Sequence, residues 1–163
     1  MEAVVTKLRN VGALENTYVV FTSDNGWHHG EHRIRMGKRT PYEESIHMPL
    51  LIRGPGVQAG TTTDLEGSAT TPWRTAVLLE HRDEQYPSAS FYAIRTSDGW
   101  KYIEYEGGFK ELYDLNPDAD PYELNNLNNA NSPPAELATR LQALKGCGAS
   151  SRGGGSAKEG PRG

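Results

Sequence analysis

The sequence predicts an α/β fold in the N-terminal part of the chain, followed by a small antiparallel sheet and a terminal helix. The α/β part is indicated by a helical pattern that leads into an apolar run at 18–21. The antiparallel sheet is indicated by tight-turn dipeptides at 98–99 and 107–108, each between two β-rich segments. The terminal helix is indicated by leucines at helical spacing after residue 132.

The first elements are a helix and a strand. Apolar residues recur at helical spacing over 4–11, and Gly12 can end this helix. The run at 18–21 is β-branched and aromatic without polar alternation, which predicts a strand covered on both faces, as in a parallel sheet. Ligands usually gather at the carboxyl end of such a strand. The loop from Ser23 to Arg39 shows little hydrophobic periodicity, and an irregular loop of this length usually has a functional role.

A second helix and strand follow this loop. Thr40 to Glu43 has the pattern of a capping box, in which Pro41 takes the first helical position. We expect this helix to end before Pro49, because proline disfavours the helical conformation of the residue before it. The apolar run at 50–52 predicts a second buried strand.

The C-terminal part predicts a sheet, a helix and a tail. Segments at 91–96, 100–106 and 109–115 predict three antiparallel strands. The helix that follows has one apolar face, which we expect to pack on this sheet and which consists of Leu137, Leu141 and Leu144. Residues 146–163 contain seven glycines and few apolar side chains, so we expect a disordered tail.

Composition and charge limit the classes of partner. With a net charge of -4 and a pI near 5.7, the chain lacks the basic surface that nucleic-acid phosphates require, so we expect no nucleic-acid partner. No window approaches the roughly 20 apolar residues of a membrane span, and the N-terminus lacks the layout of a signal peptide. We therefore expect a soluble chain without a membrane partner. The single cysteine, Cys147, excludes an internal disulfide.

Oxygen donors stand at the end of the first strand. Asp24 offers a carboxylate and Asn25 an amide oxygen, which are ligands that Ca²⁺ and Mg²⁺ prefer. The alternative is an ordinary turn, since Asn25-Gly26 is a strong hairpin signal. No alternating strand follows Gly26, so such a hairpin would lack its second arm.

Histidines follow in the same loop. His28, His29 and His32 stand near Glu31, which raises zinc as an alternative, but their order differs from the His-Glu-x-x-His pattern and Gly30 weakens a helix there. We expect polar loop residues instead. Either His28 or His32 can hydrogen-bond a substrate or serve as a proton donor.

A pair of cations follows the histidines. Lys38 stands between Gly37 and Arg39, where its ammonium can present a point charge to an anion beside a bound cation. The alternative is that Lys38 and Arg39 are ordinary solvated residues. The neighbouring Asp24 and Asn25 favour the anion-binding interpretation.

These segments together resemble a known family. Thr22 to His32, Gly37 to Ser45 and Pro49 to Gly56 are similar to the later half of the catalytic domain of type I sulfatases, within the alkaline-phosphatase-like superfamily. Among these, the N-acetylglucosamine-6-sulfatase and bacterial arylsulfatase branch is the most similar. Further segments resemble the small C-terminal subdomain of the family, and these are Trp100 to Tyr105, Glu111 to Leu115 and Asp120 to Leu127.

The resemblance implies roles for individual residues. Asp24 and Asn25 correspond to two ligands of a Ca²⁺ ion, for which Mg²⁺ is an alternative, and Lys38 corresponds to the lysine that holds a sulfate oxygen. Arg39 is a weaker candidate for substrate binding, and a histidine, His28 or His32, would protonate the leaving alcohol. The implied function is sulfuric ester hydrolysis of a sulfated sugar or an aryl sulfate.

The resemblance also implies a division of the chain. Residues 1–57 correspond to the C-terminal portion of the catalytic domain, as a partial mixed sheet with helices. Residues 58–90 correspond to a shortened connector, 91–145 to the antiparallel subdomain with its helix, and 146–163 to the tail. Met1 falls inside a helix that the family enters from upstream sequence, so the chain resembles a fragment.

One part of the family pattern is missing. The nucleophile of the family is a formylglycine made from the first residue of a Cys/Ser-x-Pro-x-Arg motif, and no such motif occurs in the 163 residues. Cys147 lacks the proline and cannot be that nucleophile. We therefore expect no turnover by this chain alone, and a partial sheet would expose apolar strand surface through which the chain can self-associate.

Two alternatives remain open at this point. One is a phosphatase or phosphonate hydrolase of the same superfamily, against which Asn25 and the block around Lys38 argue. The other is a non-catalytic remnant that binds an anion.

Overall fold

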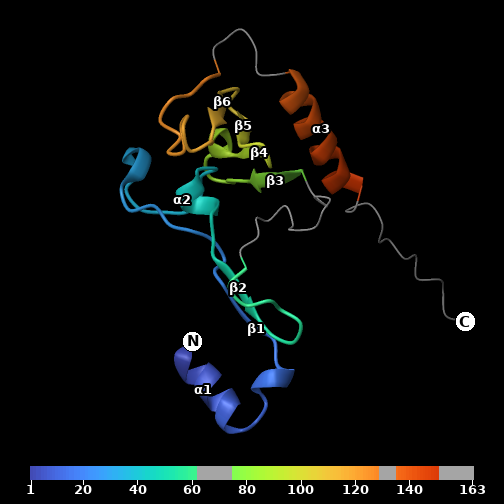
Figure 1. The fold of residues 1–163 in the computed structure, drawn as a ribbon. Helices are drawn as coiled ribbons and strands as arrows, with labels where there is room; N and C mark the ends of the chain where they lie inside the picture. Colours follow the sequence, from blue (N-terminus) through green and yellow to red (C-terminus); the bar gives the residue numbers. More distant parts are fainter. Residues whose placement is uncertain (62–74, 129–134, 151–163) are drawn as a thin grey trace, which may run out of the picture. The chain divides into compact units, whose positions relative to one another are not determined.

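A computed structural model describes residues 1–61, 75–128 and 135–150 (Figure 1). The chain divides into two compact units, Met1–Pro72 and Trp73–Gly163. Within the described ranges, no helix combines the length and the apolar character that a membrane span requires.

The described part of the first unit contains two α-helices, two strands and short 3₁₀ turns. Helix α1 (Glu2–Asn10) ends before Gly12, whose φ of 71° is readily adopted by glycine, so the predicted helix and its end are confirmed. The other elements in chain order are a 3₁₀ turn at Leu14–Asn16, β1 (Val19–Thr22), a 3₁₀ turn at Glu31–Arg33, α2 (Glu43–Ile46) and β2 (Leu50–Arg53).

The two strands of the first unit form an antiparallel ribbon, in which Val19 lies opposite Arg53 and Thr22 opposite Leu50. The prediction of a strand covered on both faces of a parallel sheet was wrong for this structure. Apolar side chains of both strands are exposed, among them Leu51 at 59%. An apolar run indicates that a strand can be buried, but a two-stranded ribbon leaves much of its surface to solvent.

The helix after the loop begins later than its capping box predicts. Helix α2 starts at Glu43, and its N-cap residue is Tyr42 in an extended conformation without a side-chain cap. The Thr40 hydroxyl instead contacts the ring of His28, at 2.6 Å. The predicted end is confirmed, because the helix stops at Ile46, before Pro49.

The described part of the second unit contains a four-stranded antiparallel sheet, a 3₁₀ turn at Pro87–Ala89 and one α-helix. The sheet has the order β3-β4-β5-β6, and its strands are β3 (Ala76–His81), β4 (Phe91–Thr96), β5 (Trp100–Tyr105) and β6 (Lys110–Asp114). The last three confirm the predicted meander. Strand β3 lies inside the segment expected as a connector at 58–90, so the sheet begins at Ala76 rather than at 91. Its Val77-Leu78-Leu79 core is favourable for a strand, and residues 62–74 lie outside the described ranges.

Helix α3 (Ala135–Ser150) packs along the sheet, as Figure 1 shows. The core of this unit joins one face of the sheet to the predicted apolar face of the helix, and its buried residues are Ile94, Tyr102, Leu112, Leu137 and Leu141, with Leu144 packed against them. The helix extends to Ser150, so the prediction of a disordered tail from 146 was wrong for its first residues; adding residues to a formed helix is easier than starting one. Residues 151–163 lie outside the described ranges.

Candidate cation and anion site

The long loop after β1 is closed by two backbone contacts. The N–H of His28 donates to the carbonyl of Gly37 at 2.9 Å, and the two residues form an isolated antiparallel bridge. The N–H of Gly26 donates to the carbonyl of Ser45 at 3.0 Å. The first contact returns the chain toward its starting point, so that Lys38 comes back beside the end of β1.

Lys38 and Asp24 meet directly. The Lys38 ammonium donates to Asp24 Oδ2 at 2.6 Å. This hydrogen bond holds the pKa of Asp24 below its ordinary value of 3.8, and the backbone N–H of Asn25 acts in the same direction. The Lys38 ammonium is thus the positive charge that faces Asp24, the carboxylate that we expect to bind a metal ion.

Asn25 presents an oxygen without a partner. Its Oδ1 is buried and accepts no hydrogen bond from the described residues. A buried acceptor left unpaired is unfavourable by about 1–3 kcal/mol, so such atoms usually have a ligand role or another stated cause. An amide oxygen next to a carboxylate fits a hard divalent cation, and the residues present therefore fit the Ca²⁺ that the resemblance implies.

Two of the histidines, His28 and His32, form an aromatic cluster with Tyr42. His28 is fully buried, with Nε2 at 2.6 Å from Thr40 Oγ1. The ring of His32 stacks on Tyr42 with centroids 4.0 Å apart, and its Nε2 lies 3.3 Å from Glu44 Oε2. The two histidine rings meet edge to face at 6.1 Å. Their ring nitrogens therefore contact Thr40 and Glu44, a pairing that the sequence pattern did not indicate.

The backbone at His32 is strained. His32 and Arg33 have φ values of 54° and 60°, in the left-handed region that is unfavourable for residues other than glycine. Such conformations are typically unfavourable by about 1–3 kcal/mol each and persist where the surroundings fix them. The contacts of His32 with Tyr42 and Glu44 supply that restraint.

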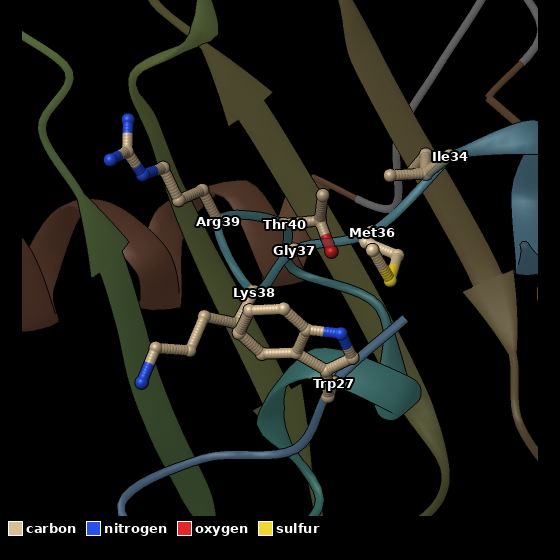
Figure 2. Close-up of a pocket in the computed structure, with 7 residues that line it drawn as sticks. All are labelled: Trp27, Ile34, Met36, Gly37, Lys38, Arg39 and Thr40. Atoms are coloured by element: carbon tan, nitrogen blue, oxygen red, sulfur yellow. The ribbon is translucent and has the colours of Figure 1, made fainter. Parts of the chain in front are cut away.

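A pocket of about 480 Å³ lies beside Lys38. Its lining comes entirely from the loop, and the residues are Trp27, Ile34, Met36, Gly37, Lys38, Arg39 and Thr40 (Figure 2). In Figure 2 the charged ends of Lys38 and Arg39 point to one side, whereas Ile34 and Met36 lie on the other. Arg39 thus lines the pocket together with Lys38, whereas neither His28 nor His32 is among the lining residues.

The contact between Lys38 and Asp24 should be measurable as a lowered pKa of the Asp24 carboxyl group. Because the pKa of Asp24 is lowered, the ion pair persists above pH 3.8 and is lost as the pH falls through the lowered value. We expect the carboxyl ¹³C resonance of Asp24 to titrate below 3.8, and Lys38→Ala to move this pKa upward. Lys7→Ala, on the exposed face of α1, serves as the control and should leave it unchanged. A pKa of Asp24 that is the same with and without Lys38 would contradict the ion pair.

Comparison with known proteins identifies the family of the chain. Residues 1–75 match the family described as Sulfatase. N-acetylglucosamine-6-sulfatase of Bos taurus is 28% identical over 90% of this chain and 38% of its own length, and arylsulfatase of Volvox carteri is 30% identical over 88% and 31%. The alignment with the bovine protein spans 213 positions, more than the 163 residues of this chain, so that protein has additional residues within the matched part.

A solved structure is similar as well. That of BT4656 in complex with its substrate D-glucosamine-2-N,6-O-disulfate has a TM-score of 0.71 and 28% sequence identity, and it covers 89% of this chain and 37% of that one. This likeness confirms the predicted fold class. The chain spans about a third of the length of these relatives. The chain therefore belongs to the sulfatase family, and it corresponds to a part of such a protein.

Proposed function

We propose that this chain carries the cation-binding and sulfate-binding part of a sulfuric ester hydrolase that acts on a sulfated sugar or an aryl sulfate. The observation that supports it most is the contact of 2.6 Å between Lys38 Nζ and Asp24 Oδ2, beside the unpartnered oxygen of Asn25. A carboxylate, an amide oxygen and an ammonium placed together suit a divalent cation and an oxyanion that share one site. The names of the relatives and the sulfated substrate of BT4656 agree with this function.

The proposal gives each residue a role. Asp24 and Asn25 would hold Ca²⁺, with Mg²⁺ as the alternative, and Lys38 would bind a sulfate oxygen, with Arg39 beside it. When bound, the cation would neutralise negative charge on the sulfate oxygens. Among the histidines, His28 would position Thr40 at the pocket wall, because its ring contacts the Thr40 hydroxyl. We assign no proton donor among the described residues, because His32 lies outside the pocket lining and contacts Tyr42 and Glu44.

The attacking group is not supplied by these residues. The Cys/Ser-x-Pro-x-Arg motif from which the family makes formylglycine is absent from the sequence given. The 163-residue chain would therefore bind without turnover, and an assay with nitrocatechol sulfate checks this.

The exposed ribbon of β1 and β2 supports self-association as a further property. Its apolar residues and its open edges offer a surface on which a second ribbon can pair. Light scattering should give a mass above that of the monomer. Leu51→Lys should return the mass to that of the monomer, whereas Leu124→Lys, at an exposed position in the second unit, should not.

Calcium titration tests the proposed cation site. We expect Ca²⁺ to shift the amide resonances at 24–26 with a Kd near the millimolar range, because Asp24 and Asn25 supply two of the six to eight oxygens that Ca²⁺ takes. Asp24→Asn and Asn25→Ala should each weaken binding several-fold. Asp118→Asn, an exposed aspartate of the second unit, is the matched control. The cation site would be ruled out if both variants bound Ca²⁺ as the unmodified chain does.

A further inference from the structure

The pocket beside Lys38 has an apolar wall that the cation and sulfate roles do not use. This wall, called the aromatic wall below after its tryptophan, consists of Trp27, Ile34 and Met36. Trp27 is 46% exposed and Met36 is 72% exposed. Exposed apolar residues gathered at a pocket typically mark a surface that binds a ligand, because water leaves such a surface readily.

The backbone fixes this wall next to the ammonium. His28 pairs with Gly37 in an antiparallel bridge, so Trp27, the preceding residue, lies opposite Lys38, the following one. Figure 2 shows the Trp27 indole between the side of Met36 and the side of Lys38. An ester whose sulfate group reaches Lys38 would therefore place its alcohol part near the indole.

We propose that the aromatic wall binds the ring of the sulfate ester, with Trp27 as a stacking platform and Ile34 and Met36 beside it. This inference rests on the proposed function, since Lys38 must hold the sulfate group. An aryl ring has a flat apolar face and a pyranose ring has a face of C–H groups, and an indole can cover either of them. The pocket volume of about 480 Å³ falls within the usual range for small-molecule sites. Trp27 is thus a specificity-determining residue that favours ring esters over open-chain ones.

The experiment compares esters that differ only in their alcohol part. Methyl sulfate, phenyl sulfate and glucosamine 6-sulfate are titrated into the 163-residue chain with excess Ca²⁺, and binding is followed by NMR. We expect at least one ring ester to bind about tenfold more tightly than methyl sulfate, a difference typical of one good stacking contact. The tighter of the two ring esters identifies the ring as aryl or pyranose.

Variants separate the wall from the sulfate contact. Trp27→Ala should lower ring-ester affinity about tenfold and leave methyl sulfate unchanged, and Trp27→Phe should restore part of the loss. Tyr122→Ala, at an exposed aromatic of the second unit, is the control and should change neither affinity. The aromatic wall is overturned if Trp27→Ala leaves ring-ester affinity unchanged, or lowers methyl sulfate affinity equally. The proposed function fails separately, if Lys38→Ala leaves methyl sulfate affinity unchanged.

Discussion

Lys101→Met is expected to destabilise the second unit by about 3–5 kcal/mol, because it removes the ammonium from a buried ion pair. The ammonium of Lys101 on β5 donates to Glu123 Oε1 at 2.7 Å, and both side chains are almost completely buried. A buried charge that loses its partner keeps its desolvation penalty without the compensating attraction. Amide hydrogen exchange along β5 measures the effect as a lower free energy of opening.

Two further variants test this interpretation. Lys101→Met combined with Glu123→Leu removes both charges, and we expect it to recover most of the lost stability. Lys110→Met is the matched control on the neighbouring strand, where the ammonium lies 3.2 Å from Glu104 and the lysine side chain is 42% exposed. Because exposed ion pairs contribute about 0–1 kcal/mol, this control should change stability little. Equal losses for Lys101→Met and Lys110→Met would contradict the role of burial.

Gly26→Ala is expected to disrupt the cation site, whereas the same substitution at Gly146 should stabilise the chain. A Cβ atom on Gly26 would clash with the carbonyl oxygen of Glu44 and would lie 3.2 Å from that of His47. These are backbone atoms, so the loop and α2 must separate, and the hydrogen bond from Gly26 to Ser45 is lost. We expect Ca²⁺ affinity to fall about tenfold or more, because the displaced residue follows Asn25 directly.

Gly146 provides the opposite case. It lies in α3, and a Cβ atom there would meet no described atom within 4 Å. Alanine should stabilise this helix by up to about 1 kcal/mol, since glycine is the poorer helix former. Amide exchange at His28 and in α3 checks both variants. Retained protection at His28 together with retained Ca²⁺ binding in Gly26→Ala would contradict the packing of the loop on α2.

The sequence indicated candidate residues better than it indicated their arrangement. Asp24, Asn25 and Lys38 could be chosen as candidates because their chemical types suit cations and anions. Their proximity depends on the bridge between His28 and Gly37, which is a tertiary contact without a local signal. A pattern of residue types thus identified candidates, and only the closed loop brought Lys38 to Asp24.

Predictions from local sequence patterns failed where a tertiary contact decided the structure. Thr40 fits a capping box, but its hydroxyl contacts the buried ring of His28, and α2 starts later without a side-chain cap. Strand β1 has the composition of a strand in a parallel sheet, but its partner β2 is antiparallel. The meander was predicted well, because tight turns fix strand pairing within a few residues.

We propose that Asp24, Asn25 and Lys38 bind a divalent cation and a sulfate group at one shared site. The most direct measurement is the affinity of the chain for methyl sulfate with and without excess Ca²⁺. If the cation and the anion share the site, Ca²⁺ should raise methyl sulfate affinity at least about fivefold, and methyl sulfate should raise Ca²⁺ affinity by the same factor. Equal affinity for methyl sulfate with and without Ca²⁺ would contradict the claim.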